Sequence, residues 1–326
     1  MRWITLFLLA LSSTALVACN DYHICAEPKA ALVAALPGRL SETGLYDDIT
    51  AGTLAGDVRP YHPSFPLWSD GAEKRRWISL PDGAEIDTRD PDDWLFPVGT
   101  KLWKEFTRDG VRVETRLLHK VGEGEADWAA MAYVWTEAGD DALAAPHGST
   151  NALGTEHDVP ASNACMGCHG GRKSRVLGFS LVQLAHDGPP EEWTLHSLVD
   201  AAVLSTAPPM NVVVPGEETT RSALGYLHAN CGHCHNQQRP ETDGPRCYDP
   251  ENDLDFWLQS KRLAVPSDTP TYHTMRKVVE AGAPADSKLF ALVSRRGEGK
   301  QMPPLATERV DTEAVATLRA WISGLK

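Results

Sequence analysis

Two five-residue motifs constrain this chain more than any other feature. They are Cys165–His169, with the sequence Cys-Met-Gly-Cys-His, and Cys231–His235, with the sequence Cys-Gly-His-Cys-His. Each has the C-x-x-C-H spacing by which proteins attach a c-type haem. The two thiols add to the vinyl groups of the porphyrin, and the adjacent histidine becomes an axial ligand of the iron. The sequence therefore predicts two covalently bound haem c groups, attached by Cys165, Cys168, Cys231 and Cys234 and ligated by His169 and His235.

The second motif lies in a sequence typical of a small haem domain. A helical pattern over residues 220–229 leads into it, and apolar residues repeat at helical spacing over 312–325, where Asp311 or Thr312 would cap the helix. Gly225 would let another helix approach closely. Met302 stands between these segments, followed by two prolines, and this arrangement resembles class I cytochrome c. The resemblance implies that Met302 is the sixth iron ligand, the alternative being that it only fills a gap in the core.

The sixth ligand of the first haem is less clearly marked. Met210, after two prolines, and His157, eight residues before Cys165, are the leading candidates, with His186 and His196 as further ones. The alternative is an open, five-coordinate iron. A closed site only passes electrons, whereas an open site could also bind peroxide or another small molecule.

A zinc site built from Cys231 and Cys234 with His228 or His233 is conceivable from the spacing. It is disfavoured, because a second C-x-x-C-H motif, an export signal and a Met-Pro-Pro segment all accompany it.

The rest of the chain predicts an α+β, multidomain protein. Short segments rich in β-branched and aromatic residues (77–80, 101–106, 112–118 and 130–135) alternate with Pro, Gly and Asp, which predicts an antiparallel, sandwich-like domain. From residue 155 the pattern becomes helical and rich in loops. We therefore expect a signal peptide over 1–18, a lead-in over 19–65 with a helix at 28–36, a β-rich domain over 66–150, and mainly α-helical c-haem modules over 151–214 and 215–326.

The N-terminus predicts export. Residues 1–18 have a basic start and an apolar run too short to span a bilayer permanently. They end in a segment that resembles a bacterial lipobox, so we expect a lipid anchor at Cys19 and a periplasmic location. Asn20, directly after Cys19, resembles a lipoprotein sorting signal for the outer membrane, so we expect the anchor to lie in that membrane. The alternative is an ordinary secretory signal. Cys25 and Cys247 remain, either as a disulfide or as two free thiols.

The charge of the chain bears on its partners. Acidic residues number 44 against 31 basic ones, giving a formal net charge of −13. This balance argues against nucleic-acid binding and favours a basic or metal-bearing partner.

Several further segments resemble a family of bacterial exported dihaem c-type cytochromes. They cover most of the mature chain, at residues 68–77, 96–101, 154–160, 226–231 and 302–305. The resemblance implies a β-domain followed by two c-haem modules, and a dehydrogenase or other periplasmic redox protein as partner. We expect electron transfer between periplasmic partners. The alternatives are a peroxidase-like dihaem oxidoreductase with a catalytic first haem, and an envelope protein that senses redox state or binds a ligand.

Overall fold

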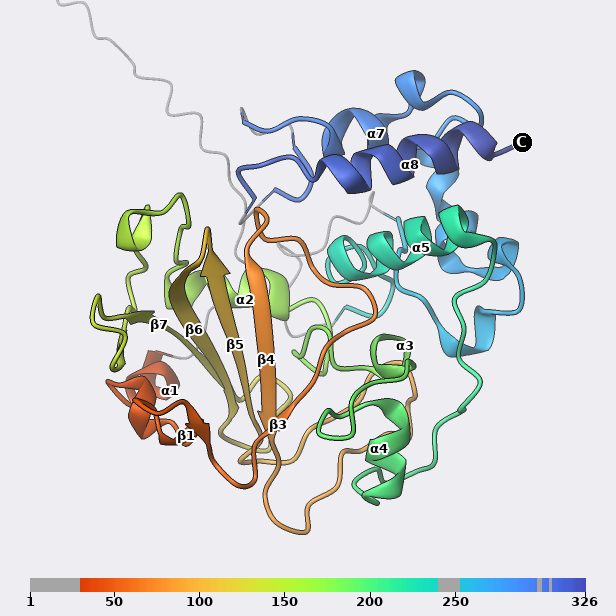
Figure 1. Ribbon diagram of the computed structural model, residues 1–326. Helices are drawn as coiled ribbons and strands as arrows, with labels where there is room; N and C mark the ends of the chain where they lie inside the picture. Colours follow the sequence, from red (N-terminus) through yellow and green to blue (C-terminus); the bar gives the residue numbers. More distant parts are fainter. Residues whose placement is uncertain (1–29, 240–252, 298–300, 305–306) are drawn as a thin grey trace, which may run out of the picture.

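A six-stranded antiparallel sheet forms the centre of the N-terminal half (Figure 1). The computed structural model describes residues 30–239, 253–297, 301–304 and 307–326. The strands pair in sequence order: β3 (Arg59–Pro60), β4 (Glu73–Ser79), β5 (Lys101–Arg108), β6 (Val111–Lys120), β7 (Trp128–Trp135) and β8 (Ala142–Ala144). A separate two-stranded ribbon consists of β1 (Tyr46–Asp48) and β2 (Thr53–Leu54). The four strand segments predicted from the sequence lie in β4 to β7, which confirms that prediction.

The hairpin between β5 and β6 is encoded locally. Its two loop residues, Asp109 and Gly110, have φ angles of 49° and 80°. Asp-Gly is the preferred pair for a two-residue turn with positive φ at both positions, because the turn then follows the twist of the strands. This turn starts the pairing of β5 with β6, and an irregularity between Phe106 and Thr107 then shifts their register.

The two faces of the sheet are covered by different parts of the chain. Because side chains alternate along a strand, Trp77, Trp103 and Tyr133 share one face, where they pack against the lead-in around Leu40 and Leu45. On the opposite face, an apolar layer packs against the segment that carries the first motif; it includes Ile78, Leu102, Leu118, Met166, Phe179 and Leu181. The structure differs from the expected sandwich, since only the β1–β2 ribbon and no second full sheet is found in the described residues.

The helices are short until the C-terminal third, and the predicted mixed α+β composition is confirmed. They are α1 (Ala30–Ala34), α2 (Cys165–His169), α3 (Leu181–Leu184), α4 (Leu195–Asp200), α5 (Glu218–Asn230), α6 (Pro270–Thr274), α7 (Lys288–Val293) and α8 (Thr312–Gly324). The Asp311 side chain accepts a hydrogen bond from the Ala314 amide at 3.0 Å, so it is the predicted cap of α8. Helices α5 and α8 pack together above the sheet (Figure 1) through a core that includes Leu227, Leu318 and Trp321.

Gly225 of α5 does allow a close approach, but of a side chain and not of a helix. A Cβ at this position would lie 2.0 Å from Cδ1 of Phe65, which precedes β4. We expected a second helix to pack against Gly225. This expectation was wrong, because Phe65 from the loop between β3 and β4 packs there instead.

No helix in the described part of the chain is long and apolar enough to cross a membrane. Residues 1–18, Cys19, Cys25 and Cys247 lie outside the described residues.

Candidate functional site at two adjoining motifs

The first motif forms helix α2, one turn anchored on the sheet. Met166, inside the motif, is 5% exposed and belongs to the same apolar layer as Leu102 and Leu118. On a helical turn, residues three and four apart share a face. Cys165, Cys168 and His169 therefore project to the same side, and both cysteines are free thiols.

His169 is held in the form that suits a metal ligand. Its Nδ1 lies 2.6 Å from the carbonyl oxygen of Arg175. A carbonyl can only accept, so the proton belongs on Nδ1 and the lone pair is left on Nε2. Burial lowers the pKa of His169 to about 4, which keeps the ring neutral. Metal-bound histidines are oriented by the same second hydrogen bond, so His169 fits the predicted role.

The second motif continues directly from α5. The Cys231 amide donates to Leu227, and the His235 amide donates to Cys231 at 2.8 Å, which keeps the motif in a helical turn. The ring of His235 meets Phe256 edge-on, with 5.8 Å between centroids. Cys231 lies in the α5–α8 core, against which the half-buried Met302 packs. The structure thus brings Met302 to the core that contains the second motif.

The two motifs are in direct contact, which their separation in the sequence did not predict. The Asn236 amide donates from Nδ2 to the carbonyls of Gly171 at 3.2 Å and Gly232 at 2.9 Å. Sγ of Cys234 lies 3.9 Å from the Gly167 carbonyl oxygen. A Cβ on Gly171 would lie only 1.7 Å from the carbonyl oxygen of His233. Gly171, the second of the two glycines that follow the first motif, is the one sequence signal for this contact, because no side chain would fit there.

Arg172 fixes this contact to the loop between β4 and β5. It is 1% exposed and forms an ion pair with Asp93 at 3.3 Å. It also donates to Oδ1 of Asn236 at 3.4 Å and lies over the ring of Trp257, 4.3 Å from its centroid. Burial lowers the pKa of Arg172, and Asp93 opposes that shift. One buried cation therefore joins three segments around the motifs.

Three of the segments that carried the family resemblance, 68–77, 154–160 and 226–231, are joined by hydrogen bonds and an ion pair. The Trp68 amide donates to Asn230, the residue before Cys231, at 2.7 Å. Asp70 accepts from the Arg309 amide at 2.8 Å, and Arg309 forms an ion pair with Glu156. These bonds connect the start of the sheet to the segment that follows Met302.

The candidate sixth ligands of the first haem are engaged or exposed. Nε2 of His157 lies 2.7 Å from Oε1 of the buried Glu114, which also binds Arg116. Ligation through that nitrogen would require the bond to Glu114 to break. Met210 is 37% exposed in the segment between α4 and α5. His186 lies 2.8 Å from the His62 carbonyl through Nε2, and His196 is exposed.

The cysteines and histidines named for a zinc site are buried or half-buried. Within the described ranges, no group of three or more His, Cys, Asp or Glu side chains is placed to hold a metal ion. His228 accepts from the Leu258 amide at 3.1 Å through Nδ1. Burial raises the pKa of Cys165 to about 11 and that of Cys231 to about 12, so both are neutral thiols.

We compared the chain with family models, with curated proteins and with solved structures, and none of the three comparisons found a match.

Proposed function

We propose that this chain is an exported dihaem c-type cytochrome that transfers electrons, one at a time, between periplasmic redox partners. The contact between the two motifs carries the proposal. Asn236 bonds to Gly171 across the contact, and Cys234 touches Gly167. Porphyrins attached to adjoining loops would be close neighbours, which suits electron transfer within one chain.

The residues at both motifs fit covalent haem. All four cysteines are free thiols, and Nε2 of His169 keeps its lone pair because the Arg175 carbonyl holds Nδ1. When bound, each iron would alternate between its ferric and ferrous states. The chain itself orients His169, packs Met302 against the α5–α8 core and, through Arg172 and Asn236, fixes one motif relative to the other.

The partner and the location follow from the sequence. A formal charge of −13 favours a basic or metal-bearing partner, such as a periplasmic dehydrogenase, over nucleic acid. We also propose that the N-terminal segment is a lipoprotein signal, so that a lipid on Cys19 would hold the protein at the membrane.

Haem content tests the proposal. A pyridine haemochrome assay and the intact mass should give two haems per chain, and replacing both cysteines of either motif by alanine should leave one. A wild-type chain with fewer than two haems, after expression with a c-type maturation system, would overturn the proposal.

Met302 is tested by the optical spectrum of the oxidised protein. Ferric haem with a methionine ligand has a weak charge-transfer band in the red, which should disappear in Met302→Ala. The matched variant Met210→Ala should keep that band. If the band survives in Met302→Ala and is lost in Met210→Ala, the ligand assignment is wrong.

A second candidate is a peroxidase-like oxidoreductase with a catalytic first haem. It is favoured by the positions of the predicted sixth ligands, since His157 is bonded to Glu114 and Met210 is exposed. Spin-state spectroscopy of the oxidised protein separates the two functions. One high-spin haem that binds cyanide supports the enzyme, whereas two low-spin haems support the pure electron carrier.

A further inference from the structure

Three basic side chains lie side by side across the sheet. Arg76 of β4 pairs in register with Lys104 of β5, and Lys104 pairs with Arg116 of β6. By the alternation of the strands, all three share the face that packs against the first motif. Like charges directly opposite one another on neighbouring strands destabilise a sheet, so this row needs an anionic partner.

The described residues supply only part of that negative charge. Glu114 binds Arg116 through two hydrogen bonds, and it also binds His157. Arg76 is 7% exposed, and no described acidic side chain forms an ion pair or a hydrogen bond with Arg76 or Lys104. The Lys104 ammonium lies 4.9 Å from the centroid of the Phe106 ring, a weaker partner than a carboxylate.

The neighbouring groups do not change this balance. Lys74, also on this face, donates to the Leu67 carbonyl at 2.9 Å and has Asp70 and Asp311 in its surroundings. Burial lowers the pKa of Lys104 well below its ordinary value, and Arg76 adds to this effect. Taking unpaired charge out of water costs several kcal/mol. Arg76 is buried and Lys104 is half-buried, so these two are the unbalanced pair.

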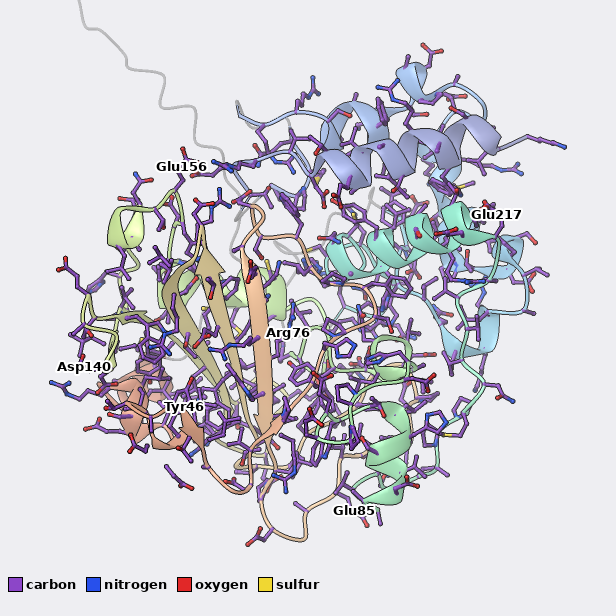
Figure 2. The ribbon with its side chains drawn as sticks, in the orientation of Figure 1. Tyr46, Arg76, Glu85, Asp140, Glu156 and Glu217 are labelled. Carbon is purple, nitrogen blue, oxygen red and sulfur yellow. The ribbon has the colours of Figure 1, made fainter. Side chains whose placement is uncertain are left out.

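Arg116 and Lys104 both lie within electrostatic reach of the first motif. Adjacent strands lie about 4.8 Å apart, so Arg76 is about 10 Å from Arg116 across the sheet. Arg76 lies in the interior of the molecule, whereas Glu85 and Glu217 lie at its periphery (Figure 2).

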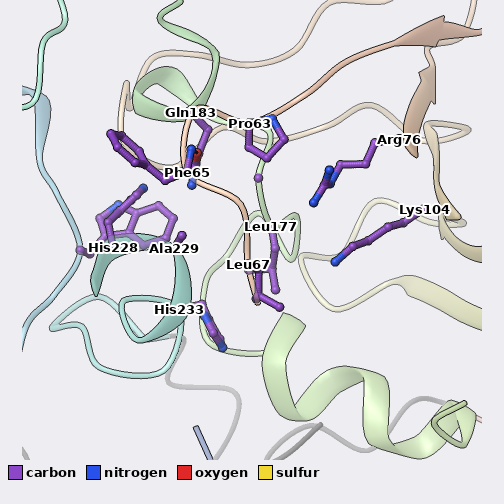
Figure 3. A pocket seen from close by; sticks show the side chains of 12 residues that line it. Pro63, Phe65, Leu67, Arg76, Lys104, Leu177, Gln183, His228, Ala229 and His233 are labelled. Atoms are coloured by element: carbon purple, nitrogen blue, oxygen red, sulfur yellow. Dashed lines mark hydrogen bonds between the residues drawn. The ribbon is translucent and has the colours of Figure 1, made fainter. Parts of the chain in front are cut away.

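A small cavity receives both unbalanced cations. Arg76 and Lys104 enter it from one side, with His228 and His233 across from them (Figure 3). Its volume of about 30 Å³ is two to three times the roughly 10–15 Å³ that one water molecule needs by the same measure. Carboxylate groups that enter from its open side therefore find room beside the two cations.

We propose that Arg76 and Lys104 bind the propionate carboxylates of the haem attached at Cys165 and Cys168. A haem joined through its vinyl edge carries its two propionates at the opposite edge, and their two negative charges match the two unbalanced cations. This inference rests on the proposed function, since it requires a haem at the first motif. The two cations also favour the ferrous state, because the ferric haem carries one more positive charge.

The test is an optical redox titration of the holoprotein with charge-removing variants. Arg76→Gln and Lys104→Gln should each shift one of the two haem potentials to a lower value, and the double variant should shift it further. Arg76→Lys keeps the charge and should retain the wild-type potential. Lys173→Gln removes an exposed cation four residues after His169 and should leave both potentials unchanged.

Infrared difference spectroscopy supplies a second readout, which remains usable if the glutamine variants fail to fold. Arg76→Lys and Lys104→Arg preserve the charge but change the donor geometry, so the redox-linked propionate bands should move. Unchanged bands, or unchanged potentials in folded glutamine variants with two haems, would overturn the inference and leave the proposed function intact. A wild-type chain without haem at the first motif would overturn both.

A free anion is the competing occupant of the cavity. Inorganic phosphate added to the wild-type holoprotein should cause no saturable shift of either potential or of the melting temperature. A saturable shift that disappears in Arg76→Gln would show that the cations bind a free anion, which contradicts the inference.

Discussion

Replacing Asn236 by alanine should weaken the contact between the two motifs. The side chain is 4% exposed. Its Nδ2 donates to Gly171 and Gly232, and its Oδ1 accepts from Arg172 and the Gln238 amide at 3.4 and 3.0 Å. Each hydrogen bond contributes about 1 kcal/mol net, and a buried group left without a partner costs about 1–3 kcal/mol. We therefore expect the free energy of unfolding to fall by about 2–4 kcal/mol.

Urea denaturation of the holoprotein measures this change, by linear extrapolation of the far-UV circular dichroism and of the haem absorbance. Gln237→Ala is the matched control, because it removes an exposed amide from the adjacent position and should change stability by less than about 0.5 kcal/mol. The two probes must give coincident transitions for a single free energy to be defined. If Asn236→Ala loses no more than Gln237→Ala at the same m-value, the side chain does not hold the motifs together.

Two further predictions concern the fold. Burial alone would raise the pKa of Asp141, but hydrogen bonds, led by that from Ser41, outweigh burial and hold this pKa below its ordinary value. The stability that Asp141 contributes is therefore fully present above about pH 4. It is lost as the pH falls through the depressed pKa. Asp141→Asn should lower the free energy of unfolding at neutral pH and flatten its fall on acidification, as followed by urea titrations at several pH values; an equal effect of exposed Asp47→Asn would contradict this. Gly225→Ala should destabilise by about 1–3 kcal/mol although alanine favours helices, because its methyl group would meet the ring of Phe65. A double-mutant cycle with Phe65→Ala should show strong coupling, and additive effects would refute the clash.

Local signals in the sequence predicted the elements well. The strand segments were legible because they are rich in β-branched and aromatic residues, such as Trp103 and Phe106 of β5, and are separated by Pro, Gly and Asp. The start of α8 was legible because Asp311 is a short-range cap. The two motifs are legible because each pattern lies within five residues, and the Arg175 carbonyl lies against Nδ1 of His169, which leaves Nε2 available as a ligand.

What the sequence did not reveal depends on register and on contacts between distant segments. Nothing in the charged run over residues 73–76 distinguishes Arg76, which is buried, from its neighbour Arg75, which is exposed. Only the pairing of β4 with β5 places Arg76 opposite Lys104. The contact between Asn236 and Gly171 likewise brings together loops that no local pattern relates.

If haem is attached at both motifs as proposed, the contact between them would also set an order for the maturation of the chain. Cys231 is 8% exposed, and the carbonyl of His233 lies against the backbone of Gly171. An enzyme that attaches a cofactor to these thiols must reach each loop separately, before the loops meet. The cofactor would therefore be attached at each motif before the two loops come into contact. Folding would then bury the bonds already formed to the cysteines.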